Sequence, residues 1–238
     1  MPDWPPELYK VPLDPDNRLL ATEQHVKEKI PFPTYKVAVL PDNLKVWTIA
    51  DIVYAVEYLK SFEFFHILDF KDKKVLSRHV TLMCAHITAA FFSYEHKSDM
   101  MIMPDEFMPF KGKLPDSEYE WCIYKKMISM MIELKIDKQE YVLLKALVVC
   151  NPAVMDLSNL ARRILTEEHT KFAKSLLSYC VSNRGQLMGP SVYGSIVSIV
   201  DTLSHIIKRQ KEMFVLVDVA KLRVHLYQAA LLQELHYA

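Results

Sequence analysis

Apolar residues recur at three- and four-residue steps early in the chain, which is the period of an amphipathic helix. Between residues 49 and 62 the stripe consists of Ile49, Ile52, Val53, Val56, Leu59 and Phe62. Residues 75–94 are instead apolar nearly all round, and Arg78 is the only formal charge among them. A helix without a polar face belongs in the middle of a domain, packed on both sides. The pattern predicts a layered helical stack rather than a bundle with two faces.

Polar residues between the apolar stretches predict where further helices begin and end. Helices are predicted at 117–135, 138–150, 158–182 and from 191 to the C-terminus. Candidate helix starts are Asp69 or Asp72, Asp137 with Glu140 as a capping box, and Ser158. The stretch 183–190, NRGQLMGP, has the composition of a loop. A second broken stretch, 100–116, predicts a β-turn or hairpin.

Glycine and proline usage supports the helical interpretation. The 238 residues include only four glycines, and residues 42–103 contain neither glycine nor proline. All-β folds need many turns with positive φ, and dinucleotide or P-loop sites need clustered glycines. Those classes are excluded, and the fold class is all-α.

Charge and cysteine usage restrict partners and compartment. The 29 basic and 29 acidic residues cancel, which argues against nucleic-acid binding by this segment. The longest uncharged runs have 15 residues, fewer than a membrane helix needs, and the N-terminus does not resemble a signal peptide. The four cysteines are isolated and predict buried free thiols in the cytosol or nucleus, without a metal site.

No arrangement of residues predicts catalysis. GPSVYG at 189–194 lacks the spacing of a nucleophile elbow, and none of the nine histidines belongs to an HExxH motif. We therefore expect no catalytic residue and no enzyme activity.

Three blocks resemble the ligand-binding domains of nuclear hormone receptors. The first, residues 56–76, matches the family signature at Lys60, Phe65, Leu68, Asp72 and Leu76, while Lys73 and Ser77 depart from it. The second, residues 134–158, matches at Leu134, Asp137, Glu140, Tyr141, Leu144, Lys145, Ala146, Pro152, Leu157 and Ser158. The third, LLQEL at 231–235, is similar to the C-terminal activation helix. The blocks occur in family order and are most similar to the hepatocyte nuclear factor 4-like receptors and their nematode branch.

The resemblance implies a three-layer antiparallel sandwich of about 10–12 helices with one short hairpin. It covers residues 17–238 and leaves 1–16 as a flexible N-terminal segment. The family's DNA-binding domain needs eight zinc-binding cysteines, so DNA would be bound only through a separate domain. The implied function is a transcription regulator in the nucleus, with the cytoplasm as an alternative compartment and no membrane partner.

The resemblance also implies a groove that binds the LxxLL helix of a coregulator. Its expected residues are Lys60, Phe65, Asp72, Leu76, Leu231, Leu232, Glu234 and Leu235. Lys60 and Glu234 would hold the two ends of the bound helix, whose terminal backbone groups are unsatisfied. Two alternatives stay open: Lys60 is an ordinary helix charge three residues after Glu57, and the terminal leucines are a core stripe. Residues 211–238 contain no glycine or proline that would separate an activation helix.

An apolar pocket is implied between the same helices and the hairpin. Its expected lining is Ile49, Val53, Val56, Met83, Ile87, Phe91, Met101, Met103, Met127, Met130, Met131 and Phe214. The arginine with which relatives hold acidic lipids is replaced here by Phe92, which favours a neutral hydrophobic ligand or a pocket closed by phenylalanines. A bound fatty acid or other apolar lipid is the only cofactor-like group expected.

A dimer is implied through the helix that follows residue 194. Ile196, Ile199, Val200, Leu203, Ile206 and Ile207 are the expected interface of a homodimer or receptor heterodimer. The rival hypothesis is a ligand-independent interaction scaffold whose pocket is filled by its own side chains.

Overall fold

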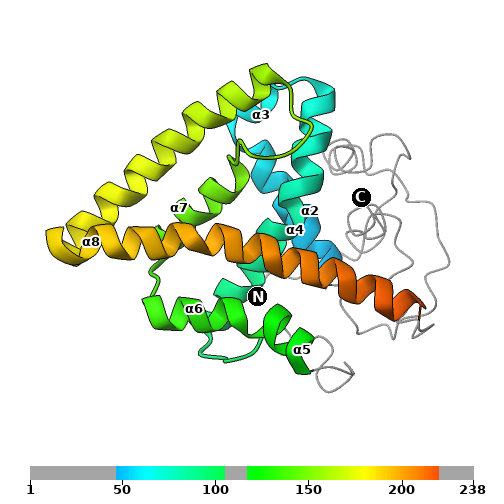
Figure 1. The fold of residues 1–238 in the computed structure, drawn as a ribbon, viewed down its shortest axis with the longest axis vertical. Coiled ribbons are helices and arrows are strands. Elements are labelled where there is room, and N and C mark those ends of the chain that lie inside the picture. Colours follow the sequence, from blue (N-terminus) through cyan, green and yellow to red (C-terminus); the bar gives the residue numbers. More distant parts are fainter. Residues whose placement is uncertain (1–46, 105–116, 220–238) are drawn as a thin grey trace.

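The computed structural model describes residues 47–104 and 117–219. These residues form seven helices and no strand, which confirms the all-α class. In chain order they are α2 (Trp47–Lys60), α3 (Glu63–Ile67), α4 (Phe70–Glu95), α5 (Ser117–Tyr124), α6 (Lys126–Leu134), α7 (Lys138–Val149) and α8 (Asn159–Val219). Figure 1 shows α4 in the middle, with α8 crossing the molecule over it. The expected hairpin at 100–116 falls mostly outside the described residues.

Helix α4 is the central element, as its all-round apolar pattern predicts. It packs against α2, α6, α7 and α8, and more than half of its 26 residues are buried. Asp69 is its N-cap and accepts a hydrogen bond from the Asp72 amide. By length and composition α4 could also cross a membrane, but most of its apolar stretch is buried inside the molecule. It therefore has the character of a core helix.

The predicted helix starts are confirmed where they can be compared. Asp137 and Glu140 form the expected capping box at α7, and the Ser158 hydroxyl accepts from the Ala161 amide at α8. The helix predicted at 117–135 is divided at Lys125 into α5 and α6. Backbone hydrogen bonds continue through this point, from Lys125 to Trp121 and from Ser129 to Lys125. The division is thus a bend rather than a loop.

The loop predicted at 183–190 is wrong. A single residue, Gly185, leaves the helical conformation with φ 85° and ψ 162°, and the helix resumes directly after it. Figure 1 shows the result as a sharp elbow between two arms of α8, which we call the first arm (159–184) and the second arm (186–219). Glycine reaches this φ without steric cost, so one residue is enough to reverse the chain.

The elbow is closed by a second glycine. A Cβ on Gly189 would lie 2.5 Å from the Val181 Cα and 2.8 Å from the Cys180 carbonyl oxygen. The two arms therefore touch backbone to backbone, an approach that no larger residue allows. Pro190 follows near the start of the second arm, where a helix has few hydrogen bonds to lose.

Candidate functional site

The site begins where α2 ends and α4 begins, because these two helices carry the first signature block. Lys60 is the last residue of α2, and its Nζ donates to Glu57 Oε1 at 2.8 Å. The Lys60 side chain is only 9% exposed, whereas that of Glu57 is 41% exposed. The structure thus contains the ion pair within α2 that the sequence allowed as an alternative to the clamp.

The other described residues of the expected groove lie beneath its surface. Phe65, Asp72 and Leu76 are all buried. The Lys73 ammonium lies 5.8 Å from the centre of the Phe65 ring and donates to the His66 carbonyl. Phe65 and Leu76 therefore pack inside the α3–α4 corner, and their contact with a coregulator stays a prediction. Leu231, Leu232, Glu234 and Leu235 lie outside the described residues.

Asp72 has a specific architectural partner. Its Oδ1 accepts from the Ser158 amide at 2.8 Å, and its Oδ2 accepts from the Ser158 hydroxyl at 2.6 Å. Hydrogen bonds to a carboxylate are about twice as strong as those between neutral groups. The pair joins the first turn of α4 to the start of α8, across 86 residues of chain. It also joins the first signature block to the second, which gives Asp72 an architectural role, while a coregulator contact by Asp72 stays a prediction.

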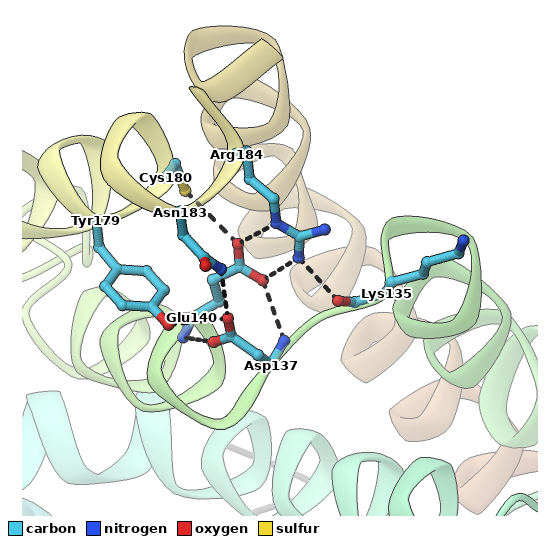
Figure 2. Close-up of polar contacts among 7 residues, drawn as sticks. All are labelled: Lys135, Asp137, Glu140, Tyr179, Cys180, Asn183 and Arg184. Carbon is cyan, nitrogen blue, oxygen red and sulfur yellow. Dashed lines mark hydrogen bonds and ion pairs between the residues drawn. The ribbon is translucent and has the colours of Figure 1, made fainter. Parts of the chain in front are cut away.

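The second signature block contains another buried polar network, which Figure 2 shows. Glu140 is completely buried and accepts from Nε and Nη2 of Arg184 at 3.1 and 2.7 Å. The same Nη2 donates to the Lys135 carbonyl at 2.8 Å. Asp137 Oδ2 accepts from the Tyr179 hydroxyl and the Asn183 amide, both at 2.9 Å. The network holds the end of the first arm of α8 against the start of α7.

The described part of the expected pocket lining lies in the interior. Val53, Val56, Met83, Ile87, Phe91, Met101, Met103, Met127 and Met131 are buried, and Met130 is half-buried. Phe91 is stacked on Tyr141 of α7, with ring centres 3.8 Å apart and planes 3° apart. Phe92, which stands at the position of the family's arginine, packs on His96 instead. The side chains of Ile49 and Phe214 lie outside the described residues.

Further polar groups meet among α2, α4 and α7, and of these Tyr141 and Lys145 belong to the second matched block. The Lys145 ammonium lies 4.3 Å from the centre of the Tyr58 ring, and the Tyr141 hydroxyl donates to the Thr88 hydroxyl at 3.3 Å. Burial raises the pKa of Asp51 to about 7 against the opposing charge of Lys145. Burial also lowers the pKa of Lys145 itself. The matched EYxxLKA sequence of α7 was the signal for Tyr141 and Lys145, but nothing local pointed to Asp51.

Two further buried polar groups lie on α4 and on the second arm of α8. The His86 Nε2 and Gln210 Oε1 atoms are both buried and have no hydrogen-bond partner among the described residues. Burial lowers the pKa of His86 to about 4, which keeps this imidazole neutral near pH 7. His86 was also missed in the sequence, because a histidine within an apolar run has no pattern of its own.

The expected dimer residues are accounted for by the chain itself. Ile196, Ile199, Leu203, Ile206 and Ile207 are buried in the monomer, and Val200 is half-buried. Helix α8 packs against α4, α5, α6 and α7, and the apolar stripe of its second arm contributes to the core. Five of these six residues therefore offer no exposed apolar surface in the monomer, and dimerisation stays a prediction.

All four cysteines are buried free thiols, as expected. In the ranges 47–104 and 117–219, no group of three or more histidine, cysteine, aspartate or glutamate side chains could hold a metal ion.

Comparisons with known proteins agree with this geometry. Residues 32–220 match the family described as the ligand-binding domain of nuclear hormone receptors. Nuclear hormone receptor family member nhr-60 of Caenorhabditis elegans is 34% identical over 75% of this chain and 39% of its own length. Family member nhr-136 of the same nematode is 34% identical over 68% of this chain and 38% of its own length. The chain thus spans about two-fifths of these relatives. Members of this family are generally transcription factors rather than enzymes, and the chain belongs to the ligand-binding domains of nuclear hormone receptors.

Proposed function

We propose that this domain binds a small hydrophobic ligand and recruits LxxLL-type coregulators within a nuclear transcription factor. The hydrogen-bonded pair of Asp72 and Ser158 carries the proposal, because it joins the two family blocks and fixes the start of α4. That end of α4, together with the end of α2, would form the wall on which a coregulator helix lies. DNA would be bound by a separate domain of a longer protein, and the receptor would belong to the hepatocyte nuclear factor 4-like nematode branch.

Lys60 would act as one end of the clamp on the bound helix. Lys60 is the last residue of α2, and Glu57, with which its ammonium forms an ion pair, is close to half exposed. A carbonyl at the C-terminal end of a docked helix would compete with the Glu57 carboxylate, which solvent reaches, for the Lys60 ammonium. Glu234 would receive the opposite end of the helix.

Peptide binding tests the coregulator role. A fluorescein-labelled LxxLL peptide should bind the full chain, and Lys60→Ala and Glu234→Ala should each weaken binding by about fivefold to tenfold. Glu57→Gln is the matched control, since it removes the partner of Lys60 but leaves the clamp. Unchanged affinity in both alanine variants would contradict the assigned roles.

The ligand role has a separate test, because a self-filled interior is the competing hypothesis. The buried methionines fit both hypotheses, and the stacking of Phe91 on Tyr141 is one place where the chain's own side chains fill the interior. Native mass spectrometry of the purified chain distinguishes the two. A co-purifying mass of lipid size supports a ligand, whereas a bare mass with unchanged stability after lipid addition supports the scaffold. Sedimentation in the same buffer tests the expected homodimer, and Val200→Arg, at the half-buried residue of the expected interface, is the variant that should disrupt it.

A further inference from the structure

The reversal of α8 depends on the backbone of a single residue. Within the described range 159–219, Gly185 alone has non-helical angles, with φ 85° and ψ 162°. Angles of this kind are essentially restricted to glycine, whereas helical angles are open to ordinary residues. A change of conformation at Gly185 would therefore align the two arms as one continuous helix.

The elbow has room to open. A Cβ on Gly185 would meet no atom within 4 Å, and Figure 1 shows the elbow at the outer edge of the molecule. Pro190 has no amide proton to donate to the carbonyl of Gln186, four residues earlier, but both residues lie in the second arm. This missing hydrogen bond is therefore the same whether the elbow is closed or straight.

The second arm cannot leave the core without a replacement. Four of its side chains are completely buried, namely Ile196, Ile199, Leu203 and Ile206. Their exposure to water would cost more than one backbone rearrangement can return, so an open monomer is not a stable state. The same arm of a second copy would fill the vacated place with identical side chains.

We propose that Gly185 is a hinge through which two copies of this chain exchange their second arms. Each copy would straighten α8 and place residues 186–219 on the body of the other, so that the core contacts are kept and only their owner changes. Very short connections favour such an exchange. The inference does not depend on binding of a ligand or a coregulator, because it involves only the packing of α8.

The exposed apolar residues beside the hinge fit this exchange. Leu187 is 90% exposed and Met188 is 57% exposed, directly after the elbow. In an exchanged pair with twofold symmetry, both hinge segments cross from one body to the other near the symmetry axis. Leu187 and Met188 of the two copies would then lie against each other and be removed from water.

Two alanine substitutions test the hinge. Gly185→Ala puts a Cβ on backbone angles that such residues avoid. Gly189→Ala puts a Cβ 2.5 Å from the Val181 Cα, whereas residues 181 and 189 of a straight helix lie about 12 Å apart. Both substitutions therefore disfavour only the closed elbow, and sedimentation should show a dimerisation constant about a hundredfold above that of the parent. Gly194→Ala is the matched control, because its Cβ meets no atom and should leave the constant within about twofold.

A distance within one chain distinguishes exchange from a side-by-side dimer. Spin labels on Arg163→Cys with Lys208→Cys, one exposed position in each arm, would lie about 68 Å apart along a straight helix and clearly closer in the closed elbow. The native cysteines are all buried, and dilution of labelled chains into unlabelled ones removes distances between copies. Labels on Arg163→Cys with Ser182→Cys, both in the first arm, should give about 28 Å in every variant.

Each other outcome has a defined meaning. Alanine variants that stay monomeric with the short distance would overturn the inference, and so would dimers that keep the short distance, since those are side-by-side pairs. If the alanine variants do not fold, the parent decides the question after unfolding in urea and refolding at high concentration. It should give a slowly dissociating dimer with the long distance, and insertion of Gly-Ser-Gly after Gly185 should reduce that dimer by about tenfold, because a longer turn closes without strain. A purely monomeric parent, or equal dimer fractions with and without the insertion, would overturn the inference.

Discussion

The ion pair between Arg184 and Glu140 offers the sharpest test of how the two arms of α8 are held. Glu140 is completely buried, while the Arg184 side chain is 23% exposed, so removing the arginine strands a carboxylate in the interior. Breaking a buried pair from one side costs about 3–5 kcal/mol. For a chain of this length that corresponds to a fall in melting temperature of about 6–20 °C. We expect this loss for Arg184→Met.

The double variant separates the contribution of the ion pair to stability from the cost of burying an unpaired carboxylate. Glu140→Gln with Arg184→Met removes both charges, so the stranded carboxylate is gone and about 1–3 kcal/mol should return relative to Arg184→Met alone. Urea unfolding of the parent, the two single variants and the double variant gives the four free energies of a double-mutant cycle. Lys171→Met is the matched control, because it breaks an exposed pair with Glu168 and should change stability by less than about 1 kcal/mol. Additive losses in the cycle, or an Arg184→Met loss equal to that of Lys171→Met, would refute the reasoning.

Three further predictions follow from the geometry. Gly189→Ala should lower the free energy of unfolding by more than 2 kcal/mol in urea because its Cβ meets the Val181 backbone, whereas Gly194→Ala, with open space around it, should raise stability by up to about 1 kcal/mol. Asp51→Asn should stabilise the chain at pH 8: the folded-state pKa is raised from 3.8 to about 7, so this carboxyl favours the folded state below pH 4 and loses that contribution between pH 4 and 7. The full shift corresponds to about 4 kcal/mol, which solvent screening of a half-buried group reduces to about 1–2 kcal/mol, so melting curves from pH 4 to 8 should be flatter in the variant. Ser158→Ala should cost about 1–3 kcal/mol, measured by urea unfolding, since the Asp72 carboxylate then loses the hydroxyl donor; a cost under 0.5 kcal/mol would contradict the architectural role.

Local sequence patterns were sufficient to predict the helices that begin at a capping side chain. The capping box at Asp137 and the N-cap at Asp69 were predicted because side-chain caps act within three residues. The central position of α4 followed from its missing polar face, since such a helix can be stable only when covered on both sides. These features depend on neighbours in the sequence, so the sequence contains the information directly.

The elbow of α8 could not be predicted from the same local information. A glycine followed by polar residues, a second glycine and a proline has the composition of a loop. Whether the chain loops or resumes a helix at once depends on the close contact between Gly189 and Val181, which forms only when the two arms fold together. The sequence therefore predicts correctly where the helix is interrupted, but wrongly that a loop of eight residues interrupts it.

Local patterns also could not decide whether the apolar stripe after residue 194 faces the core or a partner. Periodicity shows that Ile199, Leu203 and Ile206 share a face, but not how many neighbours cover it. In the structure α8 packs against α4, α5 and α6, and the stripe is buried except for Val200, which is half-buried. A helix in the middle of a layered fold contacts elements distant in sequence, and their number decides what is left for a partner.

The two polar contacts that join distant parts of the chain act on the same element. Ser158 at the start of the first arm of α8 is bound to Asp72 of α4, and Arg184 at the end of that arm is bound to Glu140 of α7. The arm is thus fixed at both ends by buried carboxylates, each supplied by a matched family block. An element fixed at one end can pivot, whereas two contacts about 26 residues apart along a helix of 1.5 Å rise per residue also determine its direction. Asp72 and Glu140 therefore set the frame that fixes the direction of the first arm relative to α4 and α7.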